Sequence, residues 1–213
     1  DLAVDAESAD STTSSDLPQT TRRAEVNGGL GDPGSRLRRA WASRFGRLVA
    51  ADLETLSSLA ESEVGKPSWE TITAELMPLI ASCRWHARRA GRILKDRRLP
   101  GRPWWLLGQR GLVRRVPLGR VGIIGTWNYP IQLLGIQIVQ AVVGGNRVIV
   151  KPSERSPKTQ RRLLELARAA GLDQEDVVVM SSGRNVGSEL LQEPDLDHVV
   201  FTGSTAIGTL VAE

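Results

Sequence analysis

Residues 121–152 read VGIIGTWNYPIQLLGIQIVQAVVGGNRVIVKP, with two short apolar stretches on either side of a longer helical pattern. The stretches at 121–125 and 147–151 are rich in valine and isoleucine and bounded by glycine or proline, which is typical of buried strands. The pattern at 130–143 begins with proline, a residue that the first turn of a helix tolerates. Strand, helix and strand in this order predict two parallel strands covered by the helix between them.

The same alternation continues toward the end of the sequence. Strands are predicted at 177–180 and 198–202, and helices at 157–170, at 186–191 and from 204 onward. One more strand is predicted at 113–116, joined to 121–125 by a turn at 117–120. Alternating strands and helices favour a parallel sheet covered on both faces. Residues 111–213 are therefore predicted to form a Rossmann-like α/β nucleotide-binding region.

Before this region the pattern is helical. Apolar residues recur every three or four positions from Ser35, then through 53–60, and again from about 69 to 94. Pro78 lies inside the third pattern and is expected to kink that helix or divide it in two. Residues 35–110 are therefore predicted to form an α-helical N-terminal segment.

The charge of the chain is uneven. The net charge is +4, but the first 16 residues hold five acids and no base, and the rest of the chain carries +9. Residues 1–25, rich in Ser, Thr, Asp and Glu, are predicted to be a disordered acidic tail without signal-peptide character. The arginines are spread along helical stretches and interleaved with acids, which argues against a nucleic-acid partner. No apolar run is long enough to predict a membrane span.

Cys83 is the single cysteine, so no internal disulfide can form. One unpaired thiol is consistent with a reducing compartment and predicts a cytoplasmic protein. Cys83 lies on the apolar face of a helical pattern, where cysteine usually behaves as a small hydrophobic residue. Two histidines and one cysteine without close spacing argue against a zinc site.

The segment GTWNYP at 125–130 directly follows a predicted strand. Open α/β sheets bind their ligands at the carboxyl ends of strands. Asn128 could donate its amide N–H groups to a developing oxyanion there. Position alone favours the alternative that it caps the helix beginning at Pro130, since asparagine is a favoured N-cap residue.

The segment KPSE at 151–154 also follows a predicted strand. Lys151 and Glu154 could both reach the hydroxyls of a bound ribose, and the carboxylate would repel a 2′-phosphate. The alternative is a solvated turn in which Ser153 or Ser156 caps the next helix.

A third segment, FTGSTAIG at 201–208, joins a predicted strand to a helix start. Its small residues would let the backbone approach a pyrophosphate, and a helix N-terminus offers N–H groups to an anion. The spacing of its glycines matches neither the dinucleotide fingerprint nor a Walker loop, and glycines also serve plain tight turns.

Taken together and in this order, the three segments closely resemble the aldehyde dehydrogenase superfamily. The resemblance is firm from about residue 113 to the end and extends more loosely back to about residue 36, through EVGKP at 63–67. The sequence GTWNYP at 125–130 is most similar to that of the branch that acts on medium, long-chain and aromatic aldehydes.

The resemblance implies NAD(P)-dependent oxidation of an aldehyde to a carboxylic acid, with NAD favoured by Glu154 and NADP possible. It also implies a role for each of eight residues. Asn128 would stabilise the oxyanion, and Trp127 would lie near the nicotinamide. Lys151 and Glu154 would bind the adenosine ribose, and Gly183 and Gly187 would lie near the adenine half. Gly203 and Ser204 would contact the pyrophosphate.

In this family a cysteine thiolate attacks the aldehyde, and a glutamate then activates water. The resemblance places both residues in motifs that would follow the segment at 201–208, and neither motif occurs in this sequence. The chain is therefore expected to be an inactive fragment with an incomplete Rossmann-like domain. The full-length protein is expected to be a homo-oligomer that acts on a small-molecule aldehyde. The alternatives are a non-catalytic nucleotide-binding module and a nucleic-acid binder acting through residues 84–120.

Overall fold

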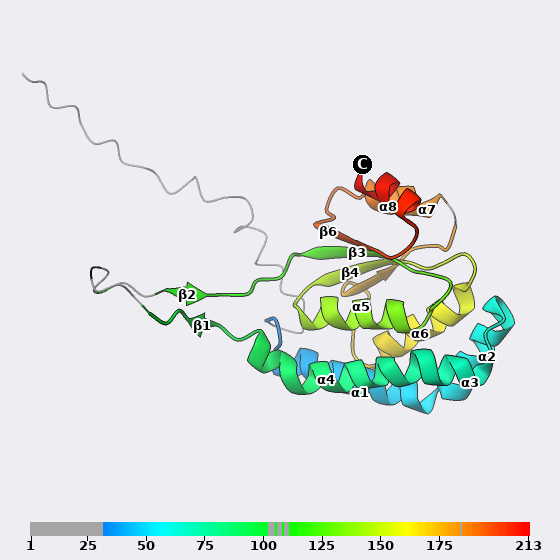
Figure 1. Cartoon of the computed structure of the whole chain (residues 1–213), viewed down its shortest axis with the longest axis horizontal. Coiled ribbons are helices and arrows are strands. Elements are labelled where there is room, and N and C mark those ends of the chain that lie inside the picture. Colours follow the sequence, from blue (N-terminus) through cyan, green and yellow to red (C-terminus); the bar gives the residue numbers. More distant parts are fainter. Residues whose placement is uncertain (1–31, 102–104, 106–107, 109–110, 184) are drawn as a thin grey trace, which may run out of the picture.

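The computed structural model describes residues 32–101, 105, 108, 111–183 and 185–213. The acidic tail predicted at 1–25 lies outside these residues. A parallel sheet forms the centre of the described part, with helices on both of its faces and a further layer of long helices beyond one face (Figure 1). No helix of the described part is long and apolar enough to cross a membrane.

The sheet has four strands, β3 (Arg120–Ile124), β4 (Arg147–Lys151), β5 (Val177–Val179) and β6 (His198–Phe201). Their order is β5-β4-β3-β6, and all three neighbouring pairs are parallel. The chain moves outward from β3 to β5 and then returns to the other side of β3. The strand order therefore reverses next to β3, which is where Rossmann-type sheets bind nucleotides.

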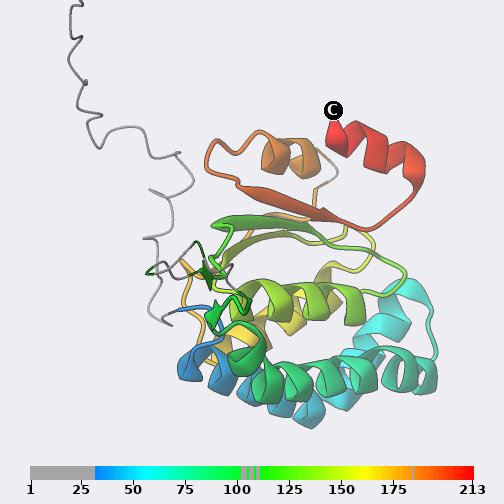
Figure 2. The same ribbon diagram turned by 60° about the vertical axis from the view of Figure 1, so that its left-hand side comes forward.

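Helices α5 (Gln132–Val143) and α6 (Pro157–Ala169) cover one face of the sheet. The shorter helices α7 (Val186–Leu191) and α8 (Thr205–Ala212) lie on the other face (Figures 1 and 2). The parallel sheet covered on both faces is thus confirmed, with element bounds within two residues of those expected.

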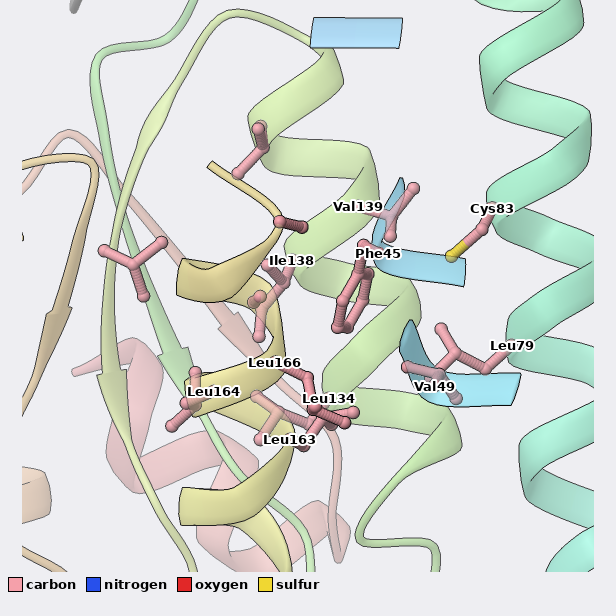
Figure 3. Packing of buried hydrophobic residues seen from close by; sticks show 14 of the residues in the cluster. Phe45, Val49, Leu79, Cys83, Leu134, Ile138, Val139, Leu163, Leu164 and Leu166 are labelled. Atoms are coloured by element: carbon pink, nitrogen blue, oxygen red, sulfur yellow. The ribbon is translucent and has the colours of Figure 1, made fainter. Parts of the chain in front are cut away.

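The outer helical layer contains α1 (Arg36–Ala51), α2 (Leu53–Val64) and α4 (Met77–Ile93). Helices α1 and α4 run antiparallel, since Gly34 approaches Leu94 while Gly46 approaches Cys83. A single buried cluster joins this layer to α5, α6 and the sheet (Figure 3). The proposed boundary near residue 110 stays a prediction.

The helix expected at 69–94 is not interrupted at Pro78. Short α3 (Ser68–Glu70) leads into the π-helical segment η3 (Thr71–Leu76), which runs directly into α4. The Met77 N–H bonds to the carbonyl of Ile72, five residues earlier. In a regular α-helix the proline ring would clash with the carbonyl four residues back, and a wider turn before Pro78 accommodates it.

The strand expected at 113–116 is wrong in its extent and in its partner. Strand β2 (Leu112–Val113) pairs with β1 (Arg97–Arg98) in an antiparallel ribbon that projects from the body (Figure 1). The following connection is held by Asn146, whose Oδ1 accepts from the Leu118 N–H at 2.7 Å and the Gly119 N–H at 3.1 Å. These donors are therefore not available to form a hairpin with β3.

Candidate functional site

Seven of the eight predicted site residues lie at or shortly after the carboxyl ends of the four parallel strands, and Gly187 lies in the helix α7 that follows β5. Trp127 and Asn128 follow β3, Lys151 and Glu154 end or follow β4, Gly183 and Gly187 follow β5, and Gly203 and Ser204 follow β6. Because the strands are parallel, these ends share one edge of the sheet, beside the point where the strand order reverses.

Lys151 and Glu154 form an ion pair, with 3.0 Å between Nζ and Oε2. The lysine side chain is 6% exposed and the carboxylate side chain is 43% exposed. The buried lysine therefore holds in place a carboxylate that is accessible at the surface. The alternative of a solvated turn holds only in part, since Glu154 is exposed in a turn while Lys151 and Ser153 are buried.

The N-terminus of α6 is capped from another part of the chain. Glu63, at the end of α2, accepts from the backbone N–H groups of Lys158 and Thr159, both at 2.8 Å, and from the Thr159 hydroxyl at 2.7 Å. Ser156 occupies the cap position but makes no side-chain cap hydrogen bond. The interpretation of Ser153 or Ser156 as the cap is therefore wrong.

The N-terminus of α5 has the same arrangement. Glu75 accepts from the Ile131 N–H at 2.8 Å and from the Gln132 N–H at 3.2 Å through one carboxylate oxygen. Among the described residues, the Oδ1 of Asn128 accepts only from the adjacent Tyr129 N–H, at 3.1 Å. Asn128 therefore does not cap α5. Its side chain is exposed, and its Nδ2 has no hydrogen-bond partner in the part of the chain that the structure describes.

Lys66 holds the loop that carries Asn128. Its Nζ lies 2.6 Å from the Asn128 carbonyl oxygen, 2.6 Å from Oε1 of Glu75, and 3.8 Å from the centre of the Tyr129 ring. The outer helical layer thus fixes the backbone at the end of β3. Neither Lys66 nor Glu75 was identified as a site residue from sequence, because the backbone groups they bind after β3 lie more than 50 positions away.

Gln160 joins the loops that follow β3 and β4. Its Nε2 donates to the Thr126 carbonyl at 2.7 Å, and its Oε1 accepts from the Ser153 N–H at 2.7 Å. A side chain at Gly125 would overlap the Gln160 amide, so glycine is required at the end of β3. This buried link also went unrecognised in the sequence, where Gln160 is one polar residue on an amphipathic helix.

The start of α8 differs from the starts of α5 and α6. Ser204 caps it, accepting from the Ile207 N–H at 3.4 Å, and no acid lies in its first turn. Thr205 and Ala206 are exposed. Since carboxylates already occupy the starts of α5 and α6, the start of α8 is the better of the three for an anion. Gly203 has a packing role, because a Cβ there would overlap the Phe201 ring.

Trp127 lies at the surface of this edge, with its side chain 49% exposed. The Arg155 guanidinium sits over its ring at 4.8 Å, which links the loops after β3 and β4 a second time. A Cβ on Gly187 would meet nothing within 4 Å, whereas one on Gly183 would touch Val186 at 3.2 Å. The β5 side of the edge is therefore open at α7.

Cys83 lies on α4 and points into the packed cluster beside Phe45 and Leu79 (Figure 3). Burial raises the pKa of its thiol to about 12. The thiolate is the reactive form, so we expect iodoacetamide at pH 8 to leave Cys83 unmodified in the folded chain and to modify it completely in urea. Mass spectrometry of the intact chain measures both, and rapid modification of the folded protein would contradict the buried position.

No group of three or more His, Cys, Asp or Glu side chains within residues 32–101, 105, 108, 111–183 and 185–213 could hold a metal ion.

Comparison with known proteins agrees with this geometry. The profile of the "Aldehyde dehydrogenase family" matches residues 16–213. An N-succinylglutamate 5-semialdehyde dehydrogenase of Sphingopyxis alaskensis is 34% identical over 168 residues, covering 78% of this chain and 33% of that relative. The crystal structure of an indole-3-acetaldehyde dehydrogenase in the apo form matches with a TM-score of 0.75 and 32% identity, covering 83% of this chain and 41% of that one.

A P. syringae indole-3-acetaldehyde dehydrogenase in complex with NAD+ also matches with a TM-score of 0.75 and 32% identity. That match covers 83% of this chain and 35% of the other. The chain spans about a third of the length of the curated relatives it matches.

Proposed function

The chain belongs to the aldehyde dehydrogenase family, and on this basis we propose that it supplies the cofactor-binding part of an enzyme that oxidises an aldehyde to a carboxylic acid with NAD. The proposal rests on which groups lie at the edge of the sheet where the strand order reverses. There the Lys151–Glu154 pair follows β4, and the exposed start of α8 follows β6.

The residues present fit a dinucleotide. The Glu154 carboxylate is half exposed and is held by a buried lysine, so it can accept from ribose hydroxyls while Lys151 donates to them. The same carboxylate would repel a 2′-phosphate, which favours NAD over NADP. The start of α8 would receive the pyrophosphate, with Ser204 at the first turn. Gly183, Gly187 and Trp127 are assigned to the adenine and nicotinamide sides by resemblance.

Asn128 is proposed to stabilise the oxyanion that develops on the aldehyde oxygen. Its side-chain amide is exposed and does not cap α5, so it can donate at this edge. Lys66 keeps the backbone of the same residue in place. Bound NAD would supply the hydride acceptor. Cys83 takes no part, because it is buried on the far side of α5 from the sheet and its raised pKa keeps it protonated.

Nucleotide titration tests the ribose assignment. We expect Lys151→Ala to weaken AMP binding about tenfold in isothermal titration calorimetry, since a charge-assisted hydrogen bond contributes about 1.4 kcal/mol or more. Glu154→Gln should weaken AMP binding and improve the binding of 2′,5′-ADP relative to AMP. Lys158→Ala, an exposed lysine on α6, is the matched control and should leave both affinities unchanged.

Equal AMP affinity in the Lys151 variant and its control would contradict the assignment. A chain that binds NAD tightly, but shows no aldehyde oxidation in its full-length context, would instead support the alternative of a non-catalytic nucleotide-binding module. The cytoplasmic location, the homo-oligomer and the branch for medium, long-chain and aromatic aldehydes stay predictions.

A further inference from the structure

A groove lined by arginines runs between α1 and α4, on the outer helical layer. It encloses about 520 Å³. Five of the ten residues that line it are arginines, namely Arg36, Arg39, Arg47, Arg84 and Arg88. The other five are small, namely Ala40, Ser43, Gly46, Ala50 and Ala87. The groove therefore has a shallow floor of small side chains between two rows of positive charge.

The close approach of the two helices produces this shape. A Cβ on Gly46 would lie only 2.8 Å from the Cβ of Cys83, so the helices touch along their backbones there. Arginines three or four residues apart share one face of a helix, so the α1 arginines line one side of the groove and the α4 arginines line the other. The groove is thus built into the helix packing and does not depend on a loop.

Within the part of the chain that the structure describes, these arginines have no acidic partners. Arg39 bonds to the carbonyl of Gly34 and Arg47 to the hydroxyl of Ser43, both neutral groups, and none of the five takes part in a salt bridge. Like charges four residues apart on a helix, as in Arg84 and Arg88, repel each other and favour the binding of an anion between them. A concave surface of one charge also concentrates anions.

We propose that this groove binds the acidic segment of residues 1–16 of the same chain. That segment carries five acids and no base, which matches the charge of the groove. Arg36 and Arg47 lie about 16 Å apart along α1, and an extended chain from Asp5 to Asp10, with Glu7 between them, spans about 17 Å. The 15 residues between Asp16 and Asp32 can reach about 50 Å, so they easily bridge to the start of α1.

The proposal is tested by the reactivity of the groove arginines toward phenylglyoxal, followed residue by residue by mass spectrometry in low salt. The unmodified chain is compared with a D5N/E7Q/D10N variant, which keeps the length of the segment and removes three charges. We expect Arg84 and Arg88 to react about threefold more slowly in the unmodified chain than in the variant. This factor corresponds to a tethered segment with an effective concentration of about 1 mM and a Kd of about 0.5 mM, which leaves about one third of the grooves empty. The protection should disappear at high salt.

Two controls separate this outcome from general effects of charge. An E54Q/E189Q/E213Q variant loses the same charge at exposed acids outside the segment and should keep the protection. Arg161, exposed on α6 and absent from the groove, should react equally in all three proteins. Equal reactivity of Arg84 and Arg88 in the unmodified chain and the D5N/E7Q/D10N variant would overturn the proposal. Protection that falls on dilution would also overturn it, because it would identify a second copy as the occupant.

Discussion

Replacing Glu75 with alanine is expected to lower the free energy of unfolding by about 3–5 kcal/mol. Its carboxylate is fully buried, accepts from two backbone N–H groups at the start of α5, and pairs with Lys66. Removing it leaves a lysine that is only 10% exposed without its counter-charge. Urea unfolding followed by circular dichroism measures the loss, which corresponds to a decrease in Tm of roughly 6–20 °C for a chain of this length.

Glu70→Ala is the matched control for this variant. Glu70 lies five residues earlier on the same helical stretch and is only partly buried, so its replacement should change the free energy of unfolding by less than about 0.5 kcal/mol. Glu75→Gln should fall between the two, since the amide oxygen still accepts from the backbone but carries no charge for Lys66. A loss below about 1 kcal/mol for Glu75→Ala would show that the buried carboxylate is not required to join the helical layer to α5.

Replacing Trp41 with alanine is expected to destabilise the chain by about 3–5 kcal/mol as well. Trp41 is fully buried on α1, stacks on Phe45 with 5.4 Å between ring centres, and donates from Nε1 to the Ala167 carbonyl at 2.9 Å. Its loss would leave a large cavity between α1 and α6 and an unsatisfied carbonyl near the end of α6. Thermal and urea unfolding give the size of the effect.

Trp69 provides the comparison for this prediction, because 69% of its surface is exposed. Trp69→Ala should change stability by no more than about 0.5 kcal/mol. Trp41→Phe keeps much of the volume but cannot donate to Ala167, so it should cost about 1–2 kcal/mol. If both tryptophan-to-alanine variants had similar stability, the packing of α1 on α6 would be refuted.

Much of the sheet was predictable because valine and isoleucine stretches alternate with helical patterns between turn residues. β3, α5, β4 and α6 follow from this alternation, and the position of Asn128, Lys151 and Ser204 at strand ends follows from the parallel arrangement. The ion pair of Lys151 and Glu154 was also accessible from the local sequence, since its two members are three residues apart.

What the sequence did not indicate depends on long-range contacts. The ribbon of β1 and β2 joins two-residue strands separated by 13 intervening positions, and such short strands carry no clear alternation. The caps of α5 and α6 come from carboxylates 56 and 95 positions away, whereas local propensity favoured the nearby Asn128 and Ser156. Propensity describes neighbours along the chain, and these side chains meet only when the helical layer packs against the sheet region.

The two carboxylate caps also fix an order of events during synthesis of the chain, because each acid is made before the helix that it caps. Glu63 and Glu75 leave the ribosome 95 and 56 residues before the backbone N–H groups they will bind. At about 5–20 residues per second, each carboxylate waits roughly 3–20 s for its helix to emerge. Until then Glu75 lacks α5 and Glu63 lacks α6. The outer layer therefore cannot make both of its capping contacts until residue 159 has been synthesised, after β3 and β4.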